Sequence, residues 1–167
     1  FEYQGIEYNC ALVRNITERK IMEQALAESQ ERFALFMDTL PAATFIKEED
    51  GTTIYANRYM SKVMGARNWV GKSTRDIFPH DLAEKIIADD QRALKAGYQV
   101  VEEQIPISDG RQRTYQTHKF KIPRKNQTPL LGGIALDITE RKQAEEKIWR
   151  LAYFDALTHL PNRRMLL

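Results

Sequence analysis

Few side chains of this sequence are of a type that does redox or metal chemistry. The 167 residues contain three histidines and a single cysteine, Cys10. His80 and His118 could serve as axial ligands of haem, whereas no cysteine or histidine pair has the spacing of a zinc site. We expect His80, which follows Pro79 at a helix start, to be exposed, and His118 either to face inward or only to line a sheet. The sequence therefore argues against haem and predicts no bound metal.

A six-residue phrase occurs twice, as "NITERK" at residues 15–20 and as "DITERK" at residues 137–142. The two copies are 137 − 15 = 122 residues apart, which is longer than a solenoid repeat and close to the length of a small domain. Each copy follows an apolar, strand-like run and precedes a charged helical pattern. We interpret the phrase as a joint between a strand and an outgoing helix.

Three polar residues at the second joint could control how the helix leaves the strand: Asp137, Thr139 and Arg141. Thr139 can cap the helix, and Asp137 and Arg141 are four residues apart, so a carboxylate can meet a guanidinium in the first helical turn. Such a pair would fix the exit angle of the helix, and its rearrangement would change that angle. The alternative is a good helix start alone, worth about 1 kcal/mol. At the first joint Asn15 replaces the aspartate, so no such pair with Arg19 is available.

A long helix is expected from Thr17, which can cap it, to the residue before Pro41. Its larger side chains follow spacings of 4, 3, 4, 3 and 4 residues, as in a heptad seam: Met22, Leu26, Ser29, Phe33, Phe36 and Leu40. We expect residues 20–30 to meet a partner helix and residues 33–40 to pack on a core.

The next hundred residues alternate between strand and helix patterns. We expect a hairpin over 43–57, a helix over 58–65 closed by Gly65, a helical turn near 74–79, a helix over 80–97, and strands over 99–107, 111–123 and 130–138. Two strands, three helices and three strands joined by hairpins predict an α+β domain. Its five-stranded antiparallel sheet should carry the helices on one face.

Composition narrows the function classes. The chain is 43% hydrophobic and 29% charged with a net charge of +2, which is typical of a water-soluble globular protein. The densest basic run, residues 119–127, reads as a strand and a turn, so we expect no nucleic-acid partner. No apolar stretch is long enough to span a membrane, so no membrane contact is expected. A lone cysteine cannot form an internal disulfide, and this favours the cytoplasm.

Three segments, "LPAATFIKEEDGTTIYANRYMSKVMG", "DIFP" and "GGIALDITERK", resemble the PAS sensor family over roughly 110 residues. The resemblance implies the family's five-stranded sheet and helical clasp, flanked by linker helices. It divides the chain into the end of a preceding PAS domain (1–16), a linker helix (17–32), a PAS sensor domain (33–142), a signalling helix (143–154) and a last segment (155–167).

The last segment, "DALTHLPNRRMLL", resembles the opening of GGDEF diguanylate cyclase domains, whose first helix begins with D-x-L-T-x-L-P-N-R-R. His159 departs from the glycine that is common there. The signature loop with the metal-binding acids is not among these residues, so the resemblance implies a truncated cyclase start without catalytic activity. The parent protein would be a bacterial diguanylate cyclase that converts GTP to cyclic di-GMP.

Members of the PAS family differ in ligand, so the pocket has to be argued from its own residues. Residues 41–142 contain no cysteine, which argues against a flavin photosensor. A small organic ligand is the remaining candidate, and these side chains are expected to surround it: Phe45, Tyr55, Met60, Val63, Met64, Phe78, Ile86, Tyr115, His118 and Ala135. The alternative is that they fill the core completely.

Two short apolar seams flank the domain, Met22 with Leu26 and Ile148 with Leu151. Seams on both sides favour a homodimer through coiled-coil linker helices over monomeric packing. The sequence thus predicts a cytoplasmic sensory and dimerisation module that regulates an attached cyclase. The alternative is a protein–protein scaffold that binds no ligand.

Overall fold

The computed structural model describes residues 2–3, 6–7, 16–64, 68–107, 109–155 and 160–162. The chain divides into two compact units, residues 1–36 and 37–167, which are described separately. The predicted helix cap at Gly65 lies outside the described residues.

The first unit contains a two-stranded antiparallel ladder and most of the long helix. β1 (Glu2–Tyr3) pairs with β2 (Ile6–Glu7). Both strands lie in the segment 1–16, which the sequence analysis assigned to the end of a preceding PAS domain. Their origin in a preceding PAS domain stays a prediction.

The helix α1 spans Thr17–Thr39, as the spacing of its side chains predicts. Thr17 is its first helical residue and not its cap: the carbonyl of Ile16 accepts the first helical hydrogen bond, from the N–H of Lys20, at 3.0 Å. The helix ends just before Pro41, which cannot continue it. No helix in the described ranges is both long and apolar enough to cross a membrane.

The second unit is built on a five-stranded sheet in the order β4-β3-β7-β6-β5, with every neighbouring pair antiparallel. Its strands are β3 (Ala43–Lys47), β4 (Thr53–Ala56), β5 (Tyr98–Pro106), β6 (Gln112–Ile122) and β7 (Leu130–Asp137). The predicted α+β fold class and the five-stranded sheet are therefore confirmed.

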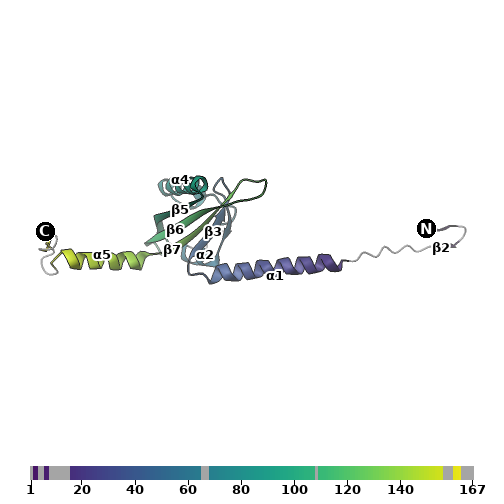
Figure 1. Ribbon diagram of the computed structural model, residues 1–167, viewed down its shortest axis with the longest axis horizontal. Coiled ribbons are helices and arrows are strands. Elements are labelled where there is room, and N and C mark those ends of the chain that lie inside the picture. Colours follow the sequence, from purple (N-terminus) through teal and green to yellow (C-terminus); the bar gives the residue numbers. More distant parts are fainter. Residues whose placement is uncertain are drawn as a thin grey trace. The chain divides into compact units, whose positions relative to one another are not determined.

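Three helices between β4 and β5 cover one face of the sheet, where their side chains meet those of the strands. They are α2 (Arg58–Met64), α3 (Thr74–Ile77) and α4 (His80–Ala96). Figure 1 shows one of them, α4, beside β5. The apolar side of α4 buries Ala83, Ile86 and Ala93. This helix ends at Gly97, whose φ of +87° is strained for other residues and whose N–H bonds the carbonyl of Ala93 at 2.8 Å.

The face of the sheet beneath these helices is called the inner face. Because successive side chains of a strand point to opposite faces, every second residue is buried there. On the central strand β7 these inner residues are Leu131, Gly133 and Ala135. Gly133 lies opposite Phe45, and a Cβ atom at Gly133 would be only 2.1 Å from the Phe45 ring. Small residues in the middle of β7 thus leave room above the sheet.

Candidate functional site

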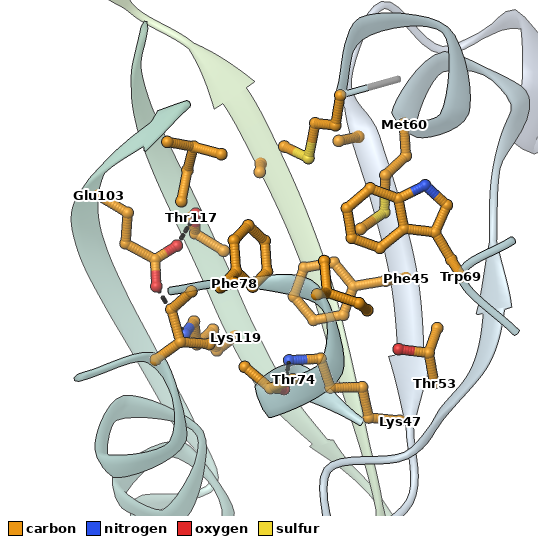
Figure 2. A pocket seen from close by; sticks show the side chains of 16 residues that line it. Phe45, Lys47, Thr53, Met60, Trp69, Thr74, Phe78, Glu103, Thr117 and Lys119 are labelled. Carbon is orange, nitrogen blue, oxygen red and sulfur yellow. Dashed lines mark hydrogen bonds and ion pairs between the residues drawn. The ribbon is translucent and has the colours of Figure 1, made fainter. Parts of the chain in front are cut away.

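A small cavity lies between the inner face of the sheet and the helices α2 to α4 (Figure 2). The space in it that is open to the centres of water molecules is about 40 Å³. A single buried water needs roughly 10–15 Å³ of such space, so the cavity has room for more than one. Its walls are formed by Ala43, Phe45, Lys47, Thr53, Met60, Met64, Trp69, Thr74, Ile77, Phe78, Ile86, Glu103, Ile105, Thr117, Lys119 and Ala135.

Six of the predicted pocket residues line this cavity: Phe45, Met60, Met64, Phe78, Ile86 and Ala135. Four others do not. Val63 is partly buried and packs against the core, and Tyr55 lies on β4 away from the cavity wall. Tyr115 is fully buried in the core, and burial, together with the charge of Asp137, raises its pKa to about 12.

His118 lies on the outer face of the sheet, because it alternates with the inner residues Thr117 and Lys119. Its Nδ1 is 2.6 Å from the hydroxyl oxygen of Tyr98. The prediction that His118 belongs to the pocket is therefore wrong. His80 is exposed at the start of α4, as expected. Among the described residues, no three histidine, cysteine or acidic side chains are grouped so that they could hold a metal ion.

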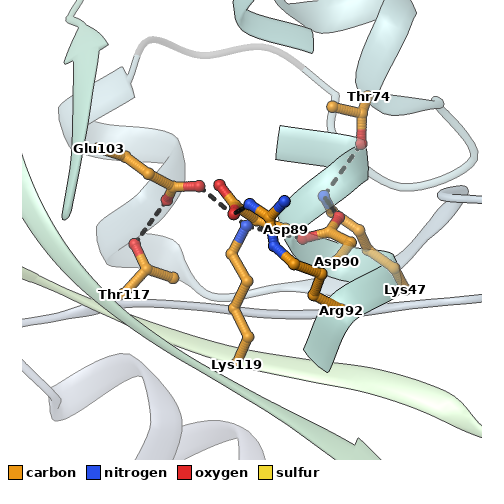
Figure 3. A network of polar contacts seen from close by, with 8 residues as sticks. All are labelled: Lys47, Thr74, Asp89, Asp90, Arg92, Glu103, Thr117 and Lys119. Carbon is orange, nitrogen blue, oxygen red and sulfur yellow. Dashed lines mark hydrogen bonds and ion pairs between the residues drawn. The ribbon is translucent and has the colours of Figure 1, made fainter. Parts of the chain in front are cut away.

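The polar side of the cavity is a network of buried charges that the sequence analysis missed (Figure 3). Asp90 of α4 lies between two lysines: its Oδ2 is 2.8 Å from Lys47 Nζ, and its Oδ1 is 2.7 Å from Lys119 Nζ. Lys119 also pairs with Glu103 Oε1 at 2.8 Å, and the hydroxyl of Thr117 donates to Glu103 Oε2 at 2.7 Å. Lys47 also donates to Thr74 Oγ1 at 3.0 Å.

These groups are almost completely removed from solvent. The exposed fractions of Lys47, Asp90, Glu103 and Lys119 are 5%, 6%, 5% and 0%. Burial by itself lowers the pKa of Lys119, but the charges of Asp90 and Glu103 and their hydrogen bonds outweigh it and raise that pKa above its ordinary value. Lys119 is therefore held as a cation, and the network connects β3, α3, α4, β5 and β6.

A signal for this network does exist in the sequence. Lys47 is two residues beyond Phe45 and four beyond Ala43 on β3, so it faces the same side as they do. Lys119 is related in the same way to Thr117 and Tyr115 on β6. Both lysines therefore lie at inner positions of strands that were predicted correctly. The period of two places each of them on the inner face, but it does not say which acidic residue of α4 reaches them.

A second group of contacts holds the joint between β7 and α5 (Thr139–Tyr153). Asp137 Oδ2 accepts a hydrogen bond from Arg113 Nη1 of β6 at 2.7 Å, and Asp137 Oδ1 accepts one from the N–H of Thr139 at 2.9 Å. The N–H of Thr114 donates to Thr139 Oγ1 at 3.0 Å, and the N–H of Ile138 donates to the carbonyl of Thr114 at 2.9 Å. The first turn of α5 is thus bonded to β6.

These contacts correct two predictions at the joint. Asp137 pairs with Arg113 on the neighbouring strand, whereas Arg141 is half exposed and lies 3.7 Å from Glu145. The expected Asp137–Arg141 pair is therefore wrong. Asp137 lies on the same side of the sheet as Arg113 of the neighbouring strand β6, whereas Arg141 lies on the outgoing helix and pairs there with Glu145. Thr139 is the first helical residue, and its hydroxyl bonds β6 instead of capping the helix.

Asp137 is the charged centre of this joint. Burial raises its pKa, but the hydrogen bonds from Thr139 and the Arg113 guanidinium outweigh burial, so its pKa lies below the ordinary value. The carboxylate is therefore ionised near neutral pH, and both of its oxygens are occupied.

The other end of α5 is also fixed. The side chain of Asn162 donates to the carbonyl of Ala152 at 2.9 Å, and its N–H donates to the carbonyl of Tyr153 at 2.8 Å. These carbonyls belong to the last turn of α5 and have no partner within the helix. Asn162 is part of the "LPN" stretch of the cyclase-like segment, most of which lies outside the described residues.

A five-stranded antiparallel sheet that carries its helices and a small cavity on one face, and ends in an outgoing helix, defines a sensor-type domain. A family model described as the PAS fold matches residues 37–143. The chain belongs to the PAS family.

One curated relative of the chain is a cyclase. A diguanylate cyclase of Vibrio cholerae is 33% identical over 138 residues, which cover 79% of this chain and 43% of that protein. The chain thus spans less than half of that relative's length.

Two solved PAS domains share the fold at low sequence identity. One is from an HTR-like protein of Haloarcula marismortui, with a TM-score of 0.55, 19% identity, and coverage of 71% of this chain and 99% of that chain. The other is from Bordetella pertussis BvgS, with a TM-score of 0.56, 17% identity, and coverage of 74% and 96%.

Proposed function

We propose that this chain is the sensory and dimerisation module of a cytoplasmic protein, and that it regulates an attached diguanylate cyclase domain that makes cyclic di-GMP. The observation that carries the proposal is the joint between β7 and α5. There Asp137 bonds both β6, through Arg113, and the first turn of α5, through the N–H of Thr139. A change in the sheet would therefore be passed to the helix without a flexible loop.

The cyclase assignment rests on similarity and on the segment after α5. The Vibrio cholerae relative is named a diguanylate cyclase, and it matches 79% of this chain. Asn162 belongs to the pattern that resembles the start of a GGDEF domain, and it is bonded to the last turn of α5. A helix held at both ends can transmit a rotation or a shift to a following domain.

The joint supplies a direct test in the full-length enzyme. We expect Arg113→Gln to change basal cyclase activity severalfold, because Asp137 then loses its charged partner while the fold stays intact. The arginine side chain of the pair is about one third exposed, so the loss of stability should be small. Initial rates of cyclic di-GMP formation and urea unfolding curves measure the two effects.

The matched control is Arg141→Gln, which removes an arginine of the same phrase whose ion-pair partner is Glu145. Its cyclase activity should stay close to that of the wild type. If the Arg113 and Arg141 variants behave alike, Asp137 serves only as part of the helix start.

The dimer proposal rests on the two seams. Met22 and Leu26 of α1 are 70% and 60% exposed within one chain, and Ile148 and Leu151 of α5 are 67% and 63% exposed. Apolar side chains repeated along a helix favour burial against another helix. We propose a second copy of this chain as the partner. Two diguanylate cyclase domains must face each other to make cyclic di-GMP, as the resemblance to GGDEF domains implies.

We expect Leu26→Glu combined with Ile148→Glu to convert the dimer of this chain into a monomer, because like charges would then face each other in both seams. Light scattering coupled to size exclusion gives the mass. The control is Gln30→Glu with Gln143→Glu, which adds the same charges outside the seams and should leave a dimer. A wild-type protein that is monomeric at high concentration would contradict the proposal.

The alternative is a scaffold that binds a partner and no ligand. The small size of the cavity favours it, because drug-sized ligands occupy sites of roughly 300–1,000 Å³. Melting curves with a wide metabolite library separate the two functions. A ligand stabilises the sensor by an amount that grows with the logarithm of its concentration over Kd, whereas a scaffold shows no shift with any compound.

A further inference from the structure

We infer that the cavity is built for an uncharged ligand: a small molecule, about the size of a single ring, that carries one polar group. This inference rests on the proposed sensory function and specifies its ligand class. It follows from the charges, the free donors and the apolar walls of the cavity described above.

The charges around the cavity cancel. Lys47 and Lys119 contribute two positive charges, Asp90 and Glu103 contribute two negative charges, and all four are linked by the contacts in Figure 3. The remaining buried acid, Asp89, is paired with Arg92. A ligand with a net charge would therefore enter without a counter-ion, and a buried charge without a partner is strongly unfavourable.

The network still offers hydrogen bonds to a neutral molecule. An ammonium group has three N–H donors, and among the described residues each lysine of the network has two oxygen partners. The third N–H of each ammonium is left for an oxygen atom in the cavity that both residues line, and Lys47 Nζ also lies 5.0 Å from the centre of the Phe45 ring. A carbonyl, amide or hydroxyl oxygen would accept this hydrogen bond without changing the balance of charge.

The opposite wall is apolar and aromatic. Figure 2 shows the rings of Phe45 and Trp69 across the cavity from Glu103, with the ring of Phe78 between the two sides. Such walls stabilise a flat apolar body by burial and by ring contacts. The combination of one polar end and a flat apolar body fits a monocyclic amide or alcohol.

Three compounds of nearly the same shape test the inference: benzamide is neutral, benzoate is an anion and benzamidine is a cation. The chain has two tryptophans, Trp69 at the cavity and Trp149 on the exposed surface of α5. The indole N–H signal of Trp69 in an NMR spectrum reports binding in the cavity, and that of Trp149 serves as the control. Titration of nitrogen-15-labelled protein should shift only the Trp69 signal, with benzamide binding in the millimolar range and the two ions about tenfold more weakly or worse.

The variant Glu103→Gln should make the cavity distinguish between the two ions. It keeps the shape of the side chain and an acceptor for Thr117, and Lys119 keeps Asp90, but the wall now carries one positive charge. Benzoate should then bind the variant more tightly than benzamidine does. The wild-type series decides the question even if the variant fails to fold.

The inference is overturned if the wild type prefers either ion, if all three compounds bind alike, or if benzamide leaves the Trp69 signal unchanged at millimolar concentration. The cyclase test of Arg113→Gln is independent of this result. A changed cyclase rate together with a failed benzamide titration would remove the ligand class and leave the proposed function standing.

Discussion

Replacing Asp90 with asparagine is expected to lower the free energy of unfolding by about 3–5 kcal/mol, the typical cost of breaking a buried ion pair on one side. Asp90 holds two ammonium groups, at 2.8 and 2.7 Å, and its own exposed fraction is 6%. In the variant the single carbonyl oxygen of asparagine can accept from only one of the two ammonium groups, Lys47 has no carboxylate partner left, and Lys119 keeps the carboxylate of Glu103. Urea unfolding followed by circular dichroism measures the loss.

Two further variants make this test specific. Glu84→Gln removes an acid of the same helix whose pair with Arg75 is exposed, so it should cost far less stability than Asp90→Asn. When Asp90→Asn is combined with Lys47→Met, the network keeps one cation, Lys119, and one anion, Glu103, so its charges balance again. The double variant should therefore lose less stability than the sum of the two single variants. Equal costs for Asp90→Asn and Glu84→Gln would show that solvent reaches the network.

Gly133→Ala is expected to destabilise the domain by about 1–3 kcal/mol, although alanine is the smallest possible addition. The new Cβ would lie 2.1 Å from Cζ and 2.5 Å from Cε2 of Phe45, so the ring has to move. The Phe45 ring can move only into the cavity, which it lines. The variant should therefore lose both stability and cavity volume, and unfolding curves and a crystal structure would measure these effects.

The neighbouring glycine is the matched control. A Cβ at Gly132 would lie 2.3 Å from the ring of Phe120, but Phe120 belongs to the outer face and is only partly buried. That ring can turn toward solvent, so Gly132→Ala should cost about 1 kcal/mol or less. If Gly132→Ala costs as much as Gly133→Ala, the effect comes from the β7 backbone and not from the Phe45 ring.

The sequence by itself determined the elements and their order. Pro41 and Gly97 end helices through the backbone of their own residues, and the alternation in β6 and β7 places each side chain on one face. These signals are local, so they can be seen in one segment without knowing its neighbours. For the same reason the repeated phrase identified the place where β7 meets α5.

Only the tertiary structure decided which side chains meet. Asp137 has Arg141 four residues away in the sequence, yet its partner is Arg113, 24 residues away, because β6 lies beside β7. In the same way Asp90 meets Lys47, 43 residues away, because α4 crosses the inner face. Ion pairs across elements depend on strand order and on the position of a helix over the sheet. Periodicity assigns a residue to a face, but only packing brings two faces together.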